Sequence, residues 1–299
     1  MSNNKQNEDN KQNQSLTKFV IYISIFLPTI SIVAAICLWN YAQPIDFVMF
    51  GMMYLSTSLG VTMGFHRYFT HHSFKCKPWL RTTLAILGTM SGQGPLISWT
   101  ANHRCHHRFS DTEGDMHSPL QPQKTLLGGL KYFWFSHIGW MLPGVDASYR
   151  RYAFDLIKDP KILWISQTYF RWLYLGLLIP GVIAGLWTMS IQGALMGILW
   201  GGLVRIGCTH QTTWAINSIC HLFGKKTYPT KDNSRDNTFF GFLCLGEGWH
   251  NSHHAFPTSA RHGLKWWQFD FTYVVIKFCE KMGLVWDVKI PDANSKPEA

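Results

Sequence analysis

Hydrophobic residues along the chain are concentrated in two long windows that contain neither lysine nor arginine. The first window runs from Phe19 to His66 and the second from Trp172 to Val204. Each window is long enough for two helices of about 20 residues, the length that crosses a bilayer, with a short turn between them. The pattern therefore predicts four membrane-spanning helices, at residues 19–39, 46–65, 170–187 and 191–210.

The polar segments outside these windows predict the orientation of the chain. The two turns, at residues 40–45 and near Met189 and Ser190, carry no lysine or arginine, whereas the other segments around the spans are basic. Because cytoplasmic segments of membrane proteins are enriched in these cations, we expect both termini and residues 67–170 to face the cytoplasm.

The two ends of the chain differ in composition from the rest. Residues 1–15 are rich in Asn, Gln and Lys and poor in apolar side chains, which predicts a disordered tail. Residues 16–286 contain all four predicted spans and are expected to form one membrane domain. Residues 287–299 are expected to be a short C-terminal tail.

The net charge of +10 raises the question of nucleic acid as a partner. The basic residues are dispersed along the polar segments, and attraction to anionic lipid headgroups explains such a distribution. We therefore expect membrane lipids, and no nucleic acid, as partners. The seven cysteines form no CxxC pair, and in a reducing cytoplasm they predict neither a disulfide nor a thiolate metal site.

Most of the 14 histidines lie in clusters with a repeated spacing. In "HRCHH" (103–107) and "HNSHH" (250–254) the histidines are at positions i, i+3 and i+4, which lie on one face of an α-helix. In "NSICH" (217–221), Asn217 and His221 are four apart and also share a face. Three imidazoles on one stripe can converge on a metal ion.

The cluster at the end of the second predicted span, "HRYFTHH" (66–72), has a different spacing. His66 and His71 are five residues apart, so on an ideal α-helix they would point about 140° away from each other. Two explanations remain open: the helix ends between them, or the two histidines serve two different metal ions.

Together the clusters predict a metal site made almost wholly of histidine. Neutral imidazole is the commonest metal ligand, and nine imidazoles packed without a metal would leave buried polar nitrogens unsatisfied. A transporter is expected to bind its ion near the middle of the bilayer, whereas these clusters lie at the end of a span and in polar segments. The zinc-protease motif HExxH is absent, and "EGWH" (247–250) is the single ExxH motif.

These motifs resemble those of the membrane fatty acid desaturases, in particular the stearoyl-CoA type delta-9 desaturases and their bacterial acyl-lipid and acyl-CoA relatives. "HRYFTH", "HRCHH" and "HNSHH" match the three histidine boxes, and "NSICHLFG" matches an NSxxH element. The flanking stretches "FSDT", "SHIGW" and "WWQFD" agree as well, and the resemblance runs from about Gly51 to Trp286. It implies an all-α fold, a four-helix transmembrane bundle with a cytoplasmic helical cap that carries a histidine-ligated di-iron centre. A multi-pass protein of a bacterial inner membrane, with its active site in the cytoplasm, is expected.

The resemblance also implies roles for individual residues. The iron ligands would be nine histidines: His66, His71, His103, His106, His107, His221, His250, His253 and His254. Asn217 would hold a water molecule, and Asp115, His117 and Glu247 would orient ligands through hydrogen bonds. His72 stands where the family usually has arginine and is expected not to be a ligand.

The activity implied is the oxygen-dependent removal of two hydrogens from adjacent methylenes of an acyl chain, which introduces a cis double bond. The third box begins with His250, as in the delta-9 branch, so the ninth carbon is the expected position. Such C–H bonds have no acidic proton, so cofactors must supply the chemistry: two iron ions (Fe2+/Fe3+), with O2 as co-substrate. The acyl group would be linked to CoA, acyl carrier protein or a lipid. The chain has no haem-attachment or HPGG element, so a separate electron donor is expected, such as a ferredoxin or a cytochrome with its reductase.

A narrow tunnel for the acyl chain is expected beside the irons. On a helix, Tyr54 and Phe50 would lie about 18 and 24 Å before His66, and one of them is predicted to close the tunnel and limit chain length. Trp99 and Asn102, just before the second box, are predicted to line it near the reacting carbons. Ordinary aromatic packing explains Phe50, Tyr54 and Trp99 equally well.

Two other functions fit parts of the pattern. An acyl hydroxylase or related oxygenase of the same histidine-box superfamily would share the ligands, although the NSxxH element and the HxxxxH spacing favour a desaturase. A non-enzymatic membrane metal transporter or sensor would bind metal without consuming oxygen.

Overall fold

A computed structural model describes residues 2–118, 125–292 and 295–297, with the backbone alone for residues 2–17. The described chain is mostly helical, with almost no strand, as predicted. The longer helices are α1 (Ser2–Cys37), α2 (Pro44–Leu59), α3 (Pro78–Met90), α4 (Leu96–Phe109), α5 (Leu126–His137), α8 (Pro160–Gln167), α9 (Tyr169–Thr188), α11 (Arg205–Leu222) and α14 (Phe271–Lys281). The short ones are α6 (Tyr149–Tyr152), α7 (Phe154–Ile157), α10 (Ile191–Gly197), α12 (Thr238–Leu243) and α13 (His250–Ala255), with 3-10 turns η1 (Trp39–Tyr41) and η3 (Gly139–Met141).

Four helical stretches are long and apolar enough to cross a membrane: Lys18–Cys37, Pro44–Thr70, Tyr169–Thr188 and Ile191–Leu222. They correspond to the four predicted spans, and the second and fourth continue beyond the predicted ends. Side chains such as Ile30, Ile36 and Trp187 are largely exposed on these helices. Apolar surface of this extent suits contact with lipid rather than water.

The hairpin turns fall where the charge-free windows predicted them. In the first, α2 begins with Pro44, and Gln43 donates its backbone N–H to the Asp46 carboxylate at 2.8 Å. In the second, the Ser190 hydroxyl caps α10 by accepting a hydrogen bond from the Gly193 N–H at 2.9 Å. Both are standard ways to satisfy the free N–H groups of a helix start.

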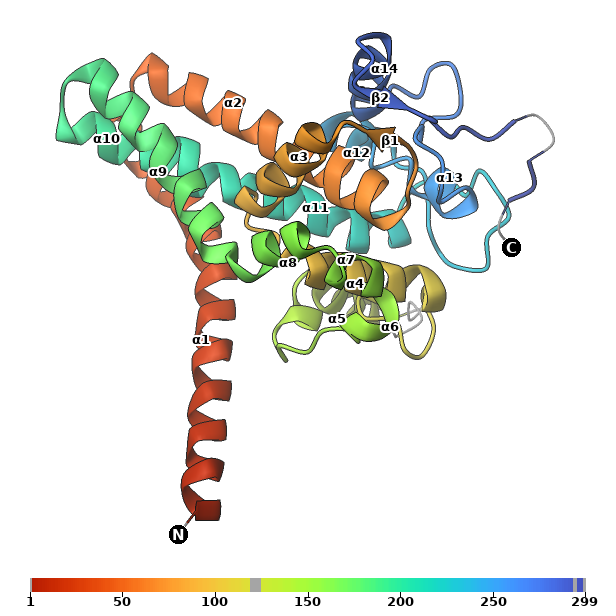
Figure 1. Ribbon diagram of the computed structural model, residues 1–299, viewed down its shortest axis with the longest axis horizontal. Helices are drawn as coiled ribbons and strands as arrows, with labels where there is room; N and C mark the ends of the chain where they lie inside the picture. Colours follow the sequence, from red (N-terminus) through yellow and green to blue (C-terminus); the bar gives the residue numbers. More distant parts are fainter. Residues whose placement is uncertain (1, 119–124, 293–294, 298–299) are drawn as a thin grey trace.

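The N-terminal segment differs from the prediction. Residues 2–15 were expected to be a disordered tail, but α1 continues through them and projects away from the other helices (Figure 1). Once a stable span has formed, each further residue that joins a helix gains one hydrogen bond, so a helix can extend into a polar sequence without tertiary packing.

Two of the spans change from α-helix to π-helix. The second span continues after α2 as η2 (Gly60–Thr70), and the fourth continues after α10 as η4 (Ile198–Val204). The η2 segment packs closely on α3, because a Cβ on Gly60 would lie 2.2 Å from the Gly88 nitrogen. The π-helix pairs residues five apart through i→i+5 hydrogen bonds, and the His71 N–H accordingly donates to the His66 carbonyl at 3.1 Å.

Apart from α3, which packs on η2, the remaining α-helices form a cap, defined here as α4–α8 with α12–α14, at the ends of η2 and α11 (Figure 1). A two-stranded antiparallel sheet joins β1 (Lys75–Cys76) to β2 (Val285–Trp286). Beyond β2, the Lys289 N–H donates to the Ser73 carbonyl at 2.9 Å. The segment predicted as a C-terminal tail is therefore hydrogen-bonded to the body as far as Lys289.

Candidate metal centre

The nine histidines predicted as ligands converge in two groups at the ends of the second and fourth spans. The five-histidine group contains His66, His71, His103, His107 and His253. The four-histidine group contains His106, His221, His250 and His254. Within each group, one ring nitrogen from every member lies within 4.8 Å of the others. Four segments that are far apart in sequence thus supply ligand atoms at spacings suited to two metal ions.

The π-helix explains the spacing of the first box. Its wider turn brings residues five apart to about the same face, so the rings of His66 and His71 have centroids 4.9 Å apart and belong to the same group. η2 does end at Thr70, as one explanation required, but the two histidines do not serve different groups. An angle of about 140° between them applies only to an ideal α-helix, which η2 is not.

Each HxxHH box is α-helical and divides its histidines between the two groups. On α4, His103 and His107 join the five-histidine group, whereas His106 joins the four-histidine group. On α13, His253 joins the former and His254 joins the latter. The i, i+3 and i+4 positions share a face but diverge along it, so one short helix can reach both groups.

Within each group, the Nε2 atoms of several histidines face one another. Nε2 to Nε2 distances are 3.0 Å for His66 and His253, 3.1 Å for His103 and His107, and 3.0 Å for His221 and His250. The Nε2 atoms of three further members are buried with no hydrogen-bond partner: His71, His106 and His254. Such clustered, unsatisfied lone pairs are costly without an electrophile among them. A pair of metal ions fits this donor set.

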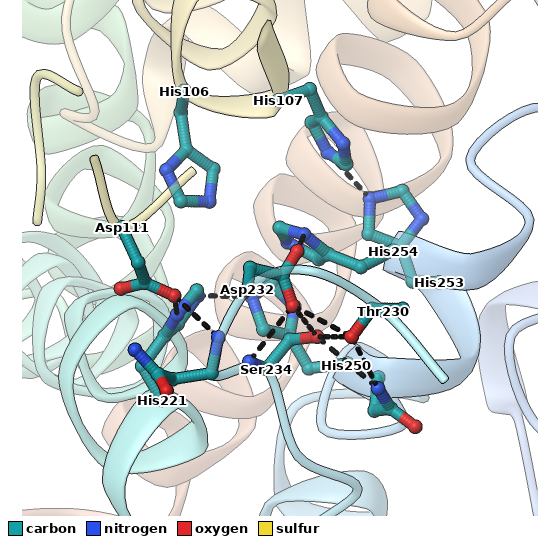
Figure 2. Close-up of polar contacts among 12 residues, drawn as sticks. His106, His107, Asp111, His221, Thr230, Asp232, Ser234, His250, His253 and His254 are labelled. Atoms are coloured by element: carbon teal, nitrogen blue, oxygen red, sulfur yellow. Dashed lines mark hydrogen bonds and ion pairs between the residues drawn. The ribbon is translucent and has the colours of Figure 1, made fainter. Parts of the chain in front are cut away.

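On the opposite side of the rings, four Nδ1 atoms meet carboxylates. His66 pairs with Glu247, His106 with Asp115 at 3.0 Å, His221 with Asp111 at 2.9 Å and His254 with Asp232 at 2.6 Å. Figure 2 shows the pairs made by Asp111 and Asp232. A carboxylate on Nδ1 keeps the proton there, so that Nε2 offers its lone pair to a metal.

Burial keeps the other imidazoles neutral. It lowers the pKa of His103, His107 and His253 well below the ordinary value, and the neighbouring histidines lower each pKa further. Burial raises the pKa of Asp232, but its interaction with His254 outweighs this and holds the pKa below its ordinary value. Neutral imidazole and ionised carboxylate are the forms that metal binding requires.

Among the residues predicted to orient ligands, Asp115 and Glu247 make the expected contacts, with His106 and His66. His117 differs. Its ring lies 4.9 Å from that of His106, but its Nδ1 is buried without a partner. Its contribution to the network is its backbone N–H, which donates to Asp115 at 2.9 Å.

Several residues of the site were not predicted from the sequence. Asp111 and Asp232 lie in loops far along the chain from the histidines they contact, so no local spacing indicated them. His262, which appeared isolated, has its ring 4.4 Å from that of His253 and is buried. Arg67 is fully buried and donates to Glu247 at 2.9 Å; its position next to His66 was the one available signal.

His72 lies outside both groups. Its side chain is mostly exposed, 3.6 Å from Asp155 and 3.0 Å from Arg104. It has a positive φ of 52°, which turns the chain away from the helix axis after His71.

A cavity of about 470 Å³ runs past both groups. Its wall includes His66, His103 and His250 from the two groups, and Asn217 beside them. Three of the four predicted tunnel residues line it: Tyr54, Trp99 and Asn102.

The fourth predicted tunnel residue, Phe50, does not line the cavity. It stacks behind Tyr54, with ring centroids 5.9 Å apart, and meets Trp200 edge-on at 6.5 Å. Phe50 and Tyr54 are one turn apart on the same helix face, so their spacing alone did not separate the cavity wall from the packing behind it.

Comparison of the sequence with known proteins shows the family of the chain. A family model described as "Fatty acid desaturase" matches residues 42–289. The chain is 43% identical over 283 residues to a hex-5-enoyl-[acyl-carrier protein] acetylenase of Moorena producens (strain JHB), covering 92% of this chain and 87% of that protein. It is 37% identical over 243 residues to an sn-1 stearoyl-lipid 9-desaturase of Anabaena variabilis, covering 81% and 82%. It is 38% identical over 277 residues to a chloroplastic palmitoyl-monogalactosyldiacylglycerol delta-7 desaturase of Arabidopsis thaliana, covering 89% and 70%. The chain belongs to the fatty acid desaturase family and is an oxidoreductase of lipid metabolism.

Proposed function

We propose that the protein is an oxygen-dependent acyl desaturase that introduces a cis double bond at the ninth carbon of a saturated acyl chain. The observation that carries the proposal is the cavity whose wall includes His66 and His250, one histidine from each group. An apolar chain threaded through this cavity would present its methylenes to both groups at once. Relatives named as 9-desaturases support the position of the double bond.

The nine histidines would hold two iron ions, five at one site and four at the other. When bound, the irons supply the oxygen-activating redox chemistry that no side chain of the chain can supply. Asn217 lies one helical turn before His221 on α11 and would hold a water molecule at the edge of the four-histidine group.

The residues of the cavity would bind and orient the acyl chain. The Trp99 ring stacks on His103, with centroids 4.9 Å apart and an interplanar angle of 13°, so it would press the chain against the five-histidine group and exclude water. Asn102 holds the loop beside the cavity by donating to Asp146 at 2.8 Å. Tyr54 would close the far end and limit chain length.

The electron donor would be a separate protein, such as a ferredoxin or a cytochrome with its reductase. We place both termini and the histidine groups on the cytoplasmic side of a bacterial inner membrane, because the polar segments around the spans are basic. The acyl group would arrive on CoA, acyl carrier protein or a lipid; relatives with carrier-protein and lipid substrates are both among the similar proteins.

The decisive experiment supplies the purified protein in liposomes with a saturated acyl substrate, O2 and a reducing system. Mass spectrometry of the products then locates any double bond. A double bond at the ninth carbon supports the proposal. A hydroxylated product would indicate the related oxygenase activity, and metal binding without oxygen uptake would indicate a transporter or sensor; either result overturns it.

Acetylenase activity is a second candidate, because the relative from Moorena producens is named for an alkenoyl substrate. The same assay with a mono-unsaturated acyl substrate tests it. If the mono-unsaturated substrate gained a triple bond and the saturated substrate gave no unsaturated product, the result would favour the acetylenase over the desaturase.

A further inference from the structure

The segment after the fourth span returns to the end of the helix bundle at two places. Thr272, at the start of α14, and Thr62, on η2, share a hydrogen bond of 2.8 Å between their hydroxyls. The Cys244 thiol, at the end of α12, donates to the Thr212 carbonyl on α11 at 3.5 Å. Two parts of the cap that follow the last span therefore lie beside Thr62 and Thr212.

The lengths of the spans indicate where these contacts lie relative to the bilayer. The second and fourth spans begin at Pro44 and Ile191. Along the helices, Thr62 lies about 27 Å from Pro44, and Thr212 lies about 32 Å from Ile191. The hydrocarbon core of a bilayer is about 30 Å thick. The end of α12 and the start of α14 therefore lie at one edge of the bilayer.

The α12 helix runs back toward this edge. Near its start, the Asn237 side-chain amide donates to the Phe223 carbonyl, at the end of α11, at 3.2 Å. Phe223 is about 16 Å further along the helix than Thr212, beside which α12 ends. The exposed side chains of the last turn of α12, Phe242 and Leu243, are therefore the ones closest to the bilayer.

Exposed aromatic side chains of the loop before α14 adjoin this turn. Phe269 stacks on Phe242, with ring centroids 6.2 Å apart and an interplanar angle of 15°. Trp267 is exposed as well, and Trp266, which follows Lys265, is 92% exposed. The aromatic patch is defined by these side chains: Phe242, Leu243, Trp266, Trp267 and Phe269.

The position and chemistry of the aromatic patch fit a phospholipid surface. Tryptophan is enriched at the headgroup level of membranes, and contiguous exposed apolar side chains mark interaction surfaces. The lipid-facing side chains of the spans, such as Tyr174 on α9, are exposed in the same way. Because the aromatic patch lies where the second and fourth spans end, a bilayer that surrounds the spans also reaches the patch.

Trp249 connects the aromatic patch to the third histidine box. It directly precedes His250 and is fully buried. Its indole N–H donates to the Phe269 carbonyl at 2.8 Å, and its ring meets that of Trp267 edge-on at 5.4 Å. A Cβ on Gly241 would lie 2.6 Å from the indole ring, so the ring is tightly enclosed. A displacement of the aromatic patch would therefore displace the start of α13.

We infer that the aromatic patch inserts into the headgroup zone of the bilayer and that this contact holds the third histidine box in place. The first box lies on η2 and is fixed by a span, whereas the third box lies on α13 and depends on the contacts of the cap. The bilayer is then one of the supports of the site. The inference needs no acyl substrate and goes beyond the proposed function.

The first test locates the contact with lipid. The full-length protein is placed in nanodiscs of phosphatidylcholine and phosphatidylglycerol, with some of the phosphatidylcholine carrying a photoreactive diazirine in its headgroup. After irradiation, proteolysis and mass spectrometry locate the labelled residues. We expect labels on the aromatic patch, at residues 242–243 and 266–269. An unlabelled patch, or a patch cross-linked to a second copy of the chain, would overturn the inference.

Phe154, on α7, is the matched control because it is an exposed aromatic residue of the cap at another level. Arg104 donates to the carbonyls of Thr70 and Tyr152 at 3.1 and 2.8 Å. Thr70 lies on the order of 10 Å beyond Thr62 along the helix, so the segment around Tyr152 is further from the bilayer. Phe154 should remain unlabelled, and labelling as strong as that of the aromatic patch would contradict the inference.

The second test measures the link to the third box. Trp266→Glu places a charge in the headgroup zone and should cause loss of labelling at the aromatic patch. Hydrogen exchange of residues 249–255, measured by mass spectrometry in nanodiscs, should become faster. Phe154→Glu adds the same charge elsewhere and should change neither. Trp266→Gln serves if Trp266→Glu does not insert.

The outcomes separate contact with lipid from ordinary packing and from the proposed function. Trp266 is 92% exposed, so its replacement removes little packing, and a role limited to the protein interior would leave both labelling and exchange unchanged. Loss of labelling with unchanged exchange would overturn the link to the third box. Neither measurement depends on product formation, so failure of the proposed desaturation would leave both expected results unaltered.

Discussion

The first and second histidine boxes each contribute two histidines to the five-histidine group, but from helices of different geometry. On the π-helix η2, His66 and His71 are five apart, with ring centroids at 4.9 Å. On the α-helix α4, His103 and His107 are four apart, with ring centroids at 4.8 Å. The separations in space are nearly equal, whereas the separations in sequence differ by one residue.

The spacing of paired histidines in the sequence therefore depends on the type of helix that holds them. HxxxxH fits the i→i+5 pairing of a π-helix, and HxxHH fits the i→i+3 and i→i+4 neighbours of an α-helix. The π-helix occurs where the second span enters the cap, at the position of the His66 and His71 pair.

The largest effect is expected from removing one ligand from each helix type. His71→Ala and His107→Ala should each lower product formation by at least about 100-fold and lower the iron content, because both histidines belong to one group. Product analysis and metal analysis of the purified proteins check this. His72→Asn, which keeps a residue that tolerates positive φ at an exposed site, should retain activity. If only one of the two alanine variants lost product formation and iron, the two histidine boxes would not contribute equally to the group.

A smaller effect is expected where η2 packs against α3. Gly60→Ala would place a Cβ 2.2 Å from the Gly88 nitrogen, so the backbones must separate, and the free energy of unfolding should fall by at least about 2 kcal/mol. Gly51→Ala, in α2 with open space around it, should instead raise it by about 0.5 kcal/mol. Thermal unfolding in detergent measures both. Equal stability of the two variants would show that close packing does not hold the π-helix.

The α-helical part of the same span is expected to set the acyl chain length. Tyr54→Ala removes a ring from the cavity wall and should shift products toward longer chains. Phe50→Ala is the matched control, because Phe50 packs behind Tyr54 against Trp200, and it should shift the profile less. Gas chromatography of the products from a mixture of acyl substrates checks this, and an unchanged profile for Tyr54→Ala would contradict it.

The smallest effect is a pH dependence shared by the two boxes. Burial, followed by neighbouring imidazoles, lowers the pKa of His71 and His103 well below 6.5 in the folded state. The unfolded chain therefore binds more protons, and the metal-free protein should lose stability as the pH falls below about 6.5. Each residue contributes on the order of 1 kcal/mol per pH unit.

Melting temperatures between pH 7.5 and 5.5 measure this dependence. His71→Gln and His103→Gln should weaken it by similar amounts if burial, not helix type, sets the pKa. A steeper loss of stability at low pH in either variant would contradict the assignment.

The four spans and the histidines that converge could be predicted from the sequence, whereas the carboxylates that contact these histidines could not. Charge-free windows predict spans because lipid excludes charged side chains over a length that the bilayer fixes. HxxHH predicts ligands because the α-helix fixes which side chains share a face. The pair of His221 with Asp111 has no such local rule, since packing alone brings together two residues 110 positions apart in the chain.

Tyr54 and Phe50 show the same limit inside one helix. Both are aromatic and lie on one face, so the pattern predicts the same role for both. Trp200, from another span, covers Phe50 and leaves Tyr54 at the cavity. The π-helix was not predicted either, because the spacing of His66 and His71 was interpreted with α-helical geometry.

The backbone bonds that join Ser73 and β1 to the last forty residues have a consequence for biosynthesis. Lys289 binds Ser73, and β2 pairs with β1, while His253 completes the group begun by His66. A ribosome must therefore finish nearly the whole chain before the first histidine box meets its partners. All four spans precede α13 in the sequence, so a nascent chain stalled before α13 would be anchored in the membrane yet unable to assemble the five-histidine group.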